Sequence, residues 1–133
     1  MSTPSSLGYL LLFKNAGHET HRHLTPAEKA ALAQRWNDWY EGLARCGKVK
    51  LGQPLALEGR LVTGPDARVV DGPYAEAKEV VGGFVWLTVG TLDEATEIAK
   101  QCPGLSVGVD VEVRALTPTS PVLDAVPARP QGR

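Results

Sequence analysis

Residues 83–89, Gly-Phe-Val-Trp-Leu-Thr-Val, are the most apolar strand candidate in the chain. They come shortly after residues 71–79, Asp-Gly-Pro-Tyr-Ala-Glu-Ala-Lys-Glu, which join a turn sequence to a cluster of charges. Side chains alternate between the two faces of a strand, and here both faces are apolar: Phe84 and Trp86 lie on one, and the residues between them on the other. The pattern predicts a buried central strand, with the polar turn at the rim of its sheet.

A second stretch, residues 8–13 (Gly-Tyr-Leu-Leu-Leu-Phe), is also apolar on both faces. Two other strand candidates differ from it. Residues 48–57 contain Pro54, which cannot donate a hydrogen bond to a neighbouring strand. Residues 109–114 alternate valines with charged residues and so have one polar face. We therefore expect 8–13 and 84–89 at the centre of a sheet and the other two at its edges.

Two helices have clear start signals. Thr25, Pro26 and Glu28 fit the N-cap, first and third positions of a helix with a capping box. The following apolar residues repeat at helical spacing and form one stripe: Leu32, Trp36, Trp39, Tyr40 and Leu43. Thr91 and Glu94 predict a second capping box and a helix that ends before Pro103. We expect the aromatic residues of the first helix to pack in the core rather than to line a pocket.

The order of elements is strand, helix, strand, small hairpin (60–63 with 68–70), strand, helix, strand. Without the hairpin this is the βαββαβ pattern of a ferredoxin-like α+β fold, an antiparallel sheet with two helices on one face. We expect a single domain over residues 8–116, a loose N-terminal tail over 1–7 and a proline-rich C-terminal tail over 117–133.

Two helices can cover only one face of this sheet, so the apolar second face of the central strands needs another cover. The cover could be a second copy of the chain, packed sheet to sheet, or the C-terminal tail folding back. We favour a homodimer because residues 117–133 offer few large apolar side chains.

Composition and charge reduce the number of functional classes that the protein could belong to. The formal net charge is −1 and there is no basic stripe, so we expect no nucleic-acid partner. No run approaches 18 apolar residues, and the N-terminus lacks the pattern of a signal peptide, so we expect no membrane span and a cytoplasmic protein. The two cysteines, Cys46 and Cys102, are then expected to be thiols. No cofactor is expected.

Residues 71–79 resemble the motif of the YCII-related family, specifically its DGPF branch, with Tyr74 where the motif has phenylalanine. The resemblance extends from Tyr9 to Leu116 and implies a ferredoxin-like subunit of a dimeric α/β barrel. A histidine–aspartate pair has been suggested as an active site in shorter members. The matching positions here hold Pro26-Ala27-Glu28 and Cys102, so that pair does not transfer.

Asp71 is the first candidate for chemistry, because a carboxylate at the mouth of a pocket could act as a general base. The alternative is a structural role, in which it accepts backbone N–H bonds within its own turn. Tyr74 could stack on a ligand and donate a hydrogen bond. Glu76 and Lys78 could hold a polar ligand, pair with each other or face solvent.

The three histidines, His18, His21 and His23, fall within six positions. Such spacing could begin a metal site, but no nearby cysteine or further histidine completes it, so we expect a solvent-exposed loop and no metal. Any of the three could be the acid–base partner of Asp71, since imidazole titrates near neutral pH, and we favour His23.

Two functions remain open. In the first, a small dimer binds a small polar or aromatic molecule in a cleft between sheet and helices, with Asp71 and His23 catalysing acid–base chemistry. In the second, it is a noncatalytic regulatory or protein-interaction module. The first function requires Asp71, Tyr74 and a histidine ring to meet at a concave pocket. The second function does not require these side chains to meet.

Overall fold

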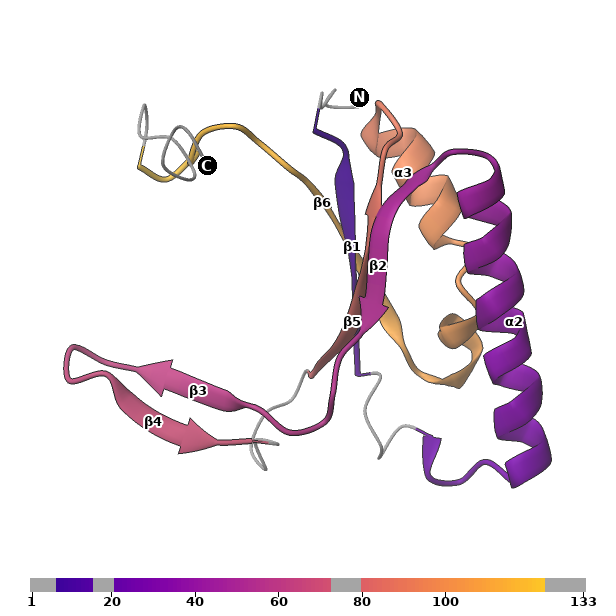
Figure 1. The fold of residues 1–133 in the computed structure, drawn as a ribbon, viewed down its shortest axis with the longest axis horizontal. Helices are drawn as coiled ribbons and strands as arrows, with labels where there is room; N and C mark the ends of the chain where they lie inside the picture. The colour runs from indigo at the N-terminus through magenta and orange to yellow at the C-terminus, as the bar shows by residue number, and fades with distance from the viewer. Residues whose placement is uncertain (1–6, 16–20, 73–79, 124–133) are drawn as a thin grey trace.

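A computed structural model describes residues 7–15, 21–72 and 80–123 of the chain. The elements follow the expected order, with one short 3₁₀ helix added before the last strand (Figure 1). In chain order they are β1 (Tyr9–Lys14), α2 (Pro26–Arg45), β2 (Val49–Pro54), β3 (Arg60–Thr63), β4 (Arg68–Asp71), β5 (Val81–Leu87), α3 (Leu92–Ala99), η1 (Pro103–Val107) and β6 (Asp110–Ala115).

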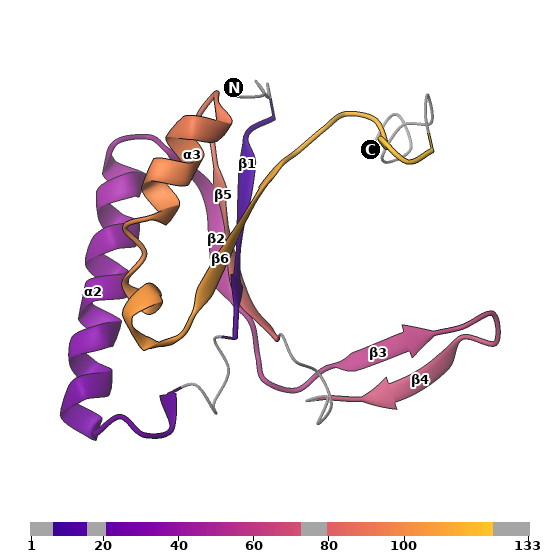
Figure 2. The ribbon, with the colours of Figure 1, turned by 180° about the vertical axis from the view of Figure 1, so that it is seen from behind.

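The main sheet has the strand order β2-β5-β1-β6, and all of its neighbouring strands are antiparallel. The doubly apolar strands β1 and β5 are central, while the strands with the proline and the charged face are at the edges. Helices α2 and α3 lie together on one side of this sheet, as the two opposite views show (Figures 1 and 2). The predicted α+β ferredoxin-like fold, with its edge and centre strands, is confirmed.

The core lies between the sheet and the helices. On the helix-facing side of the central strands, Tyr9, Leu11 and Leu87 are fully buried. Helix α3 contributes Ala95, and Val109, between η1 and β6, is also buried in this core. Since each buried leucine or valine side chain stabilises the fold by about 1.5–3 kcal/mol, this face supplies most of the driving force for folding.

Helix α2 begins as the sequence predicts. The Thr25 hydroxyl accepts a bond from the Glu28 N–H at 3.1 Å, and the Glu28 carboxylate accepts one from the Thr25 N–H at 2.8 Å. At α3 the Thr91 hydroxyl accepts from the Glu94 N–H at 3.2 Å, but the Glu94 carboxylate lies 3.7 Å from the Lys48 ammonium. The capping box is therefore complete at α2, whereas at α3 the carboxylate pairs across to the loop before β2.

Strand β2 corrects one expectation. In a regular strand the alternating residues Val49 and Leu51 would lie on the same side, but Val49 lies opposite Leu87 and Leu51 opposite Trp86. One extra residue, Lys50, forms a β-bulge, which changes the face of everything after it. Leu51 therefore lies on the open face, and the Lys50 ammonium lies 4.5 Å from the centre of the Trp86 ring.

The bounds of β5 and the presence of η1 also differ from the prediction. Strand β5 begins at Val81 and ends at Leu87, so Gly82 and Gly83 belong to the strand and Val89 does not. Gly83 lies close to β2, where a Cβ would be 3.0 Å from the Gln53 carbonyl oxygen. The turn of η1 was not predicted, because five residues are too few to establish a helical repeat.

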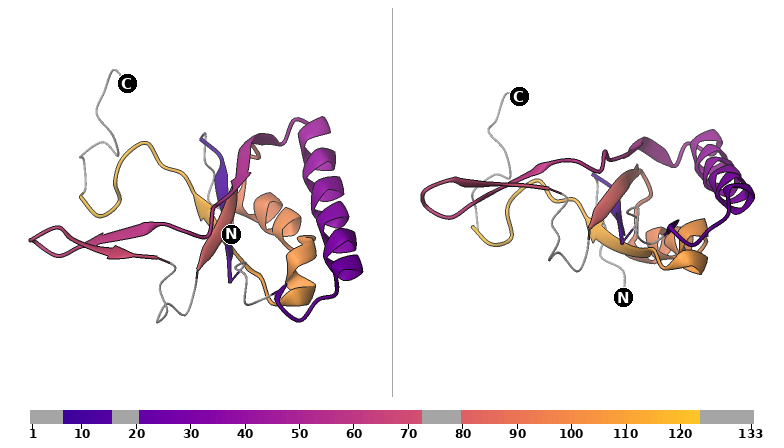
Figure 3. Two further views of the ribbon diagram at one scale, coloured as in Figure 1. Left: turned by 60° about the horizontal axis from the view of Figure 1, so that its bottom comes forward. Right: turned by 90° about the horizontal axis from the view of Figure 1, so that it is seen from below.

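The hairpin β3–β4 forms a separate two-stranded sheet, as expected of an appended hairpin. It extends away from the face opposite the helices, and residues 116–123 after β6 extend on the same side (Figure 3). At the N-terminal end, the Leu7 carbonyl oxygen accepts a 2.7 Å hydrogen bond from the Trp86 indole. Within the described ranges, neither helix has the length and apolar content needed to cross a membrane.

Candidate ligand pocket

A cavity of about 480 Å³ lies between α2 and the strands β1, β2 and β5. A pocket of this size falls within the range of small-molecule sites. One wall is aromatic and comes from α2, the floor comes from the central strands, and the far wall is the edge strand β2. The lining residues are Phe13, His21, Ala33, Trp36, Asn37, Trp39, Tyr40, Glu41, Gly52, Gln53, Pro54, Gly82, Gly83, Phe84 and Val85.

Three rings form the inner part of the wall. Phe13 meets Trp36 edge-on at 5.0 Å between ring centres, and Trp39 meets both of them edge-on at 6.0 Å and 5.7 Å. Such pairs contribute about 0.5–1.5 kcal/mol beyond simple burial, so the cluster is a rigid wall. The Trp39 indole N–H is buried without a hydrogen-bond acceptor among the described residues.

The prediction that Trp36, Trp39 and Tyr40 pack in the core rather than line a pocket is therefore only half correct. All three pack against the core cluster, and all three also line the cavity. Helical spacing identified the stripe but could not show that β2 stops short of covering it.

A glycine on β2 shapes the wall opposite α2. A Cβ at Gly52 would lie 2.7 Å from the Tyr40 ring and 3.2 Å from the Val85 side chain. Real contacts of this kind are essentially never shorter than 3.0 Å, so any side chain at this position must displace Tyr40. Gly52 thus allows the Tyr40 ring to rest against the strand at the cavity.

The rim carries polar groups from three segments: His21 before α2, Asn37 and Glu41 from α2, and Gln53 from β2. Sequence reasoning considered His21 only as one of three clustered histidines and missed the other three. The signal was present for two of them, because Ala33, Asn37 and Glu41 follow at intervals of four and lie beside the aromatic stripe. Gln53 and Gly52 could not be placed without the bulge in β2.

The predicted acid–base pair is not brought together at this pocket. His23 is exposed and is not part of the lining, whereas His21 is. Asp71 is exposed on the hairpin, where its carboxylate pairs with the Arg60 guanidinium at 3.2 Å. Of the other predicted ligand-binding residues, Tyr74, Glu76 and Lys78 lie outside the described residues, as does His18.

The remaining reactive groups do not assemble a second site. In the described ranges, no group of three histidine, cysteine or carboxylate side chains is placed to hold a metal ion. Both cysteines are free thiols, with Cys46 exposed and Cys102 buried. Burial raises the pKa of the Cys102 thiol, although hydrogen bonds from the Gly104 and Leu105 backbone oppose the shift. A thiol held protonated in this way is a poor nucleophile.

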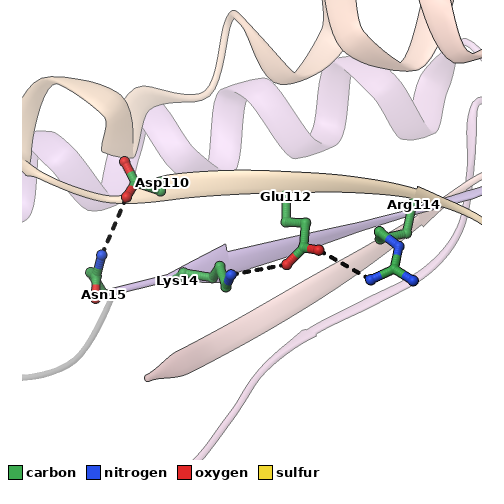
Figure 4. A network of polar contacts seen from close by, with 5 residues as sticks. All are labelled: Lys14, Asn15, Asp110, Glu112 and Arg114. Atoms are coloured by element: carbon green, nitrogen blue, oxygen red, sulfur yellow. Dashed lines mark hydrogen bonds and ion pairs between the residues drawn. The ribbon is translucent and has the colours of Figure 1, made fainter. Parts of the chain in front are cut away.

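The open face of the sheet bears a charged network along its β6 edge (Figure 4). The Glu112 carboxylate pairs with the Lys14 ammonium at 3.0 Å and with the Arg114 guanidinium at 3.1 Å. The Asn15 amide donates to Asp110 at 3.3 Å. Hydrogen bonds from Lys14 and Arg114 lower the pKa of Glu112. The network bounds the apolar centre of the open face on one side.

Fold and site together define a small ferredoxin-like domain with an aromatic-walled cleft between its long helix and its sheet. The chain belongs to the YCII-related domain family, whose model matches residues 9–118. No curated protein matches the chain.

Proposed function

We propose that this protein binds a small molecule with a flat, largely apolar body in the pocket between α2 and the sheet. The observation that carries the proposal is the lining itself: Phe13, Trp36, Trp39 and Tyr40 provide ring surfaces, and four polar residues line the same cavity. Ligand sites combine an apolar wall with a few convergent polar groups in this way.

Ala33 offers a direct test, because it is exposed and lines the cavity without belonging to the core. Ala33→Trp should fill the cavity and leave the fold intact. A ligand at 100 times its Kd stabilises the native state by about 2.7 kcal/mol, so binding is readable as a rise in Tm. We expect flat aromatic compounds such as 2-naphthol and indole to raise the Tm of the wild type but not of Ala33→Trp.

Ala31→Trp is the matched control, since Ala31 is exposed on the same helix and lies outside the lining. It should keep the wild-type response to each compound. The proposal fails if no such compound raises the Tm of the wild type, or if Ala33→Trp responds as strongly as Ala31→Trp.

Acid–base catalysis by Asp71 and His23 remains a prediction, and the geometry supports binding better than catalysis. Asp71 pairs with Arg60 on the hairpin, and neither predicted residue lines the cavity. If the pocket is a simple binding site, Asp71→Ala and His23→Ala should retain ligand affinity. Loss of binding or turnover in either variant would restore the catalytic hypothesis.

We also propose that the protein is a cytoplasmic homodimer of the α/β-barrel type, formed through the open face of the sheet. The register places apolar pairs side by side across the central strands of that face, Leu10 with Trp86 and Leu12 with Phe84. The hairpin β3–β4 and residues 116–123 extend on the same side, so a partner seated on the face would lie between them (Figure 3). A second copy presents the same apolar centre, and free thiols fit a reducing compartment.

Leu12→Asp tests the dimer, because it places a charge at the centre of the proposed interface. We expect a dimer for the wild type and a folded monomer for the variant in light scattering coupled to size exclusion. Leu105→Asp is the control, since Leu105 is exposed on η1 at 45%, away from the open face. A monomeric wild type, or a Leu12→Asp variant that stays dimeric, would contradict the assembly.

The alternative function is a noncatalytic regulatory or protein-interaction module. The exposed apolar pairs of the hairpin favour it: Leu61 lies opposite Val70 and Val62 opposite Val69, and three of these four are largely exposed. Large apolar patches on a surface mark interaction sites. This function predicts that Asp71→Ala lowers stability without removing any activity.

A further inference from the structure

The charge of the pocket lining is uneven. Among the described residues that line it, Glu41 is the only aspartate, glutamate, lysine or arginine. The other two ionisable side chains in the lining are the imidazole of His21 and the phenol of Tyr40. The Glu41 carboxylate takes part in no ion pair or hydrogen bond with the described residues. A single unpaired carboxylate at the edge of an aromatic cavity attracts a positively charged group.

The walls of the cavity favour a cation as well. Aromatic faces carry negative potential, and an ammonium group within about 6 Å of a ring centre is attracted to it. Phe13, Trp36, Trp39 and Tyr40 present four rings to the cavity. The side-chain oxygens of Asn37 and Gln53 at the rim are acceptors that an ammonium N–H can use.

Position along α2 adds to this effect. Glu41 lies four residues before the helix ends at Arg45, and the C-terminal end of a helix carries a partial negative charge. Lys29 does not line the cavity but an adjoining groove, which shares His21, Ala33 and Trp36 with it. It lies twelve residues before Glu41, about 18 Å along the helix axis. Arg45 does not line the cavity. No positively charged lysine or arginine from the described chain therefore competes within the pocket.

We propose that the ligand is an organic cation, an aromatic body with a protonated amine that pairs with Glu41. This inference rests on the proposed binding function and names the chemical class of its ligand. The aromatic part lies against the rings of α2, and the ammonium group lies at the rim, between Glu41 and the side chains of Asn37 and Gln53.

Three probes of one shape and different charge test the class: 2-(2-naphthyl)ethylamine, the corresponding alcohol and 3-(2-naphthyl)propionate. Titration followed by the indole N–H resonances of Trp36 and Trp39 reports binding at the pocket. We expect the amine to bind about three to ten times more tightly than the alcohol, as suits a rim carboxylate with partial ring contact. The acid should bind most weakly.

Glu41→Gln removes the charge and keeps the shape of the side chain. In this variant the affinity for the amine should fall to that for the alcohol, while the affinity for the alcohol stays unchanged. Asp38→Asn is the matched control, because Asp38 lies on the same helix outside the lining and accepts a hydrogen bond from Gln34. It should keep the wild-type preference.

The outcomes separate the two proposals. If the alcohol shifts the indole resonances but the amine binds no better, or if Glu41→Gln leaves the affinity for the amine unchanged, the cationic class is wrong and the pocket remains a binding site. If the acid binds more tightly than the amine, the class is likewise overturned. If none of the three probes shifts these resonances in the wild type, the binding function fails and this inference fails with it.

Discussion

Leu11 and Leu12 are neighbours on β1, and each lies directly opposite an apolar residue of β5, Val85 and Phe84 respectively. Leu11 is fully buried beneath the helices, whereas Leu12 is only partly buried on the open face. The two faces have the same strands and similar side chains. The two faces differ in their cover, because α2 and α3 lie on one face and no helix of the described chain lies on the other (Figures 1 and 2).

The comparison also shows why the site lies where it does. The helix-facing side is packed closely where α3 meets the central strands, and it opens where α2 passes over the edge strand β2. The open face has apolar area, and the cavity lies on the other side of the sheet, beside α2. The first arrangement suits a small molecule, and the second suits a broad protein surface.

Leu11→Ala should have the largest effect on stability. Removing a fully buried leucine costs about 2–5 kcal/mol, because the lost burial adds to a cavity that the core cannot close. Leu12→Ala should cost roughly 1 kcal/mol in the monomer, since part of its side chain is already in water. Urea unfolding at low protein concentration measures both. Equal losses at the two positions would show that the faces are covered alike.

Gly52→Ala should have an intermediate effect, about 1–3 kcal/mol of destabilisation, because the new methyl group would overlap the Tyr40 ring. It should also weaken ligand binding, since Tyr40 has to move into the cavity. Gly42→Ala on α2 is the matched control, with no atom within 4 Å of the added Cβ. It should stabilise the protein by about 0.5–1 kcal/mol through helix propensity. Thermal unfolding that ranks the two variants the other way would contradict the close approach at Gly52.

The smallest effect concerns pH and the charged edge of the open face. Because the folded state lowers the pKa of Glu112, the network stabilises the protein above the ordinary glutamate pKa of roughly 4.3. This contribution should decline as the pH falls through that value towards the lower folded pKa, as Glu112 is protonated. Unfolding measured between pH 3 and pH 6, approximately the range spanning that pKa, should show the decline.

Glu112→Gln should flatten this dependence on pH. Glu97→Gln removes an exposed pair with Lys100 on α3 and leaves the network intact, so it should keep the wild-type slope. A variant at Glu112 with an unchanged slope would show that the network does not contribute to acid stability.

Most of the fold could be predicted from the sequence because its signals are local. Thr25, Pro26 and Glu28 mark the start of α2 by the hydrogen bonds of a single turn. The doubly apolar β1 and β5 identify the central strands, since only a strand with neighbours on both sides and cover on both faces can bury such a pattern. Pro54 and the charged residues of β6 identify the edges for the opposite reason.

The pocket could be predicted only in outline, as a cleft between sheet and helices. The polar turn that begins at Asp71 led to the choice of Asp71 as a catalytic residue, but its side chain pairs locally with Arg60. Of the two described histidines, His21 lines the cavity and the favoured His23 does not. Neither the pairing of Asp71 with Arg60 nor the position of His21 at the cavity could be derived from spacing along the chain.

The sequence by itself determined the order of elements, the central and edge strands and the apolar stripe of α2, because each depends on residues close together in the chain. Tertiary structure alone decided the face of Leu51, the cavity beside Tyr40 and the place of Glu41 on its rim. These depend on one inserted residue in β2 and on the line along which α2 crosses the sheet. Both are set by packing between segments that are distant in sequence, so no local sequence pattern predicts them.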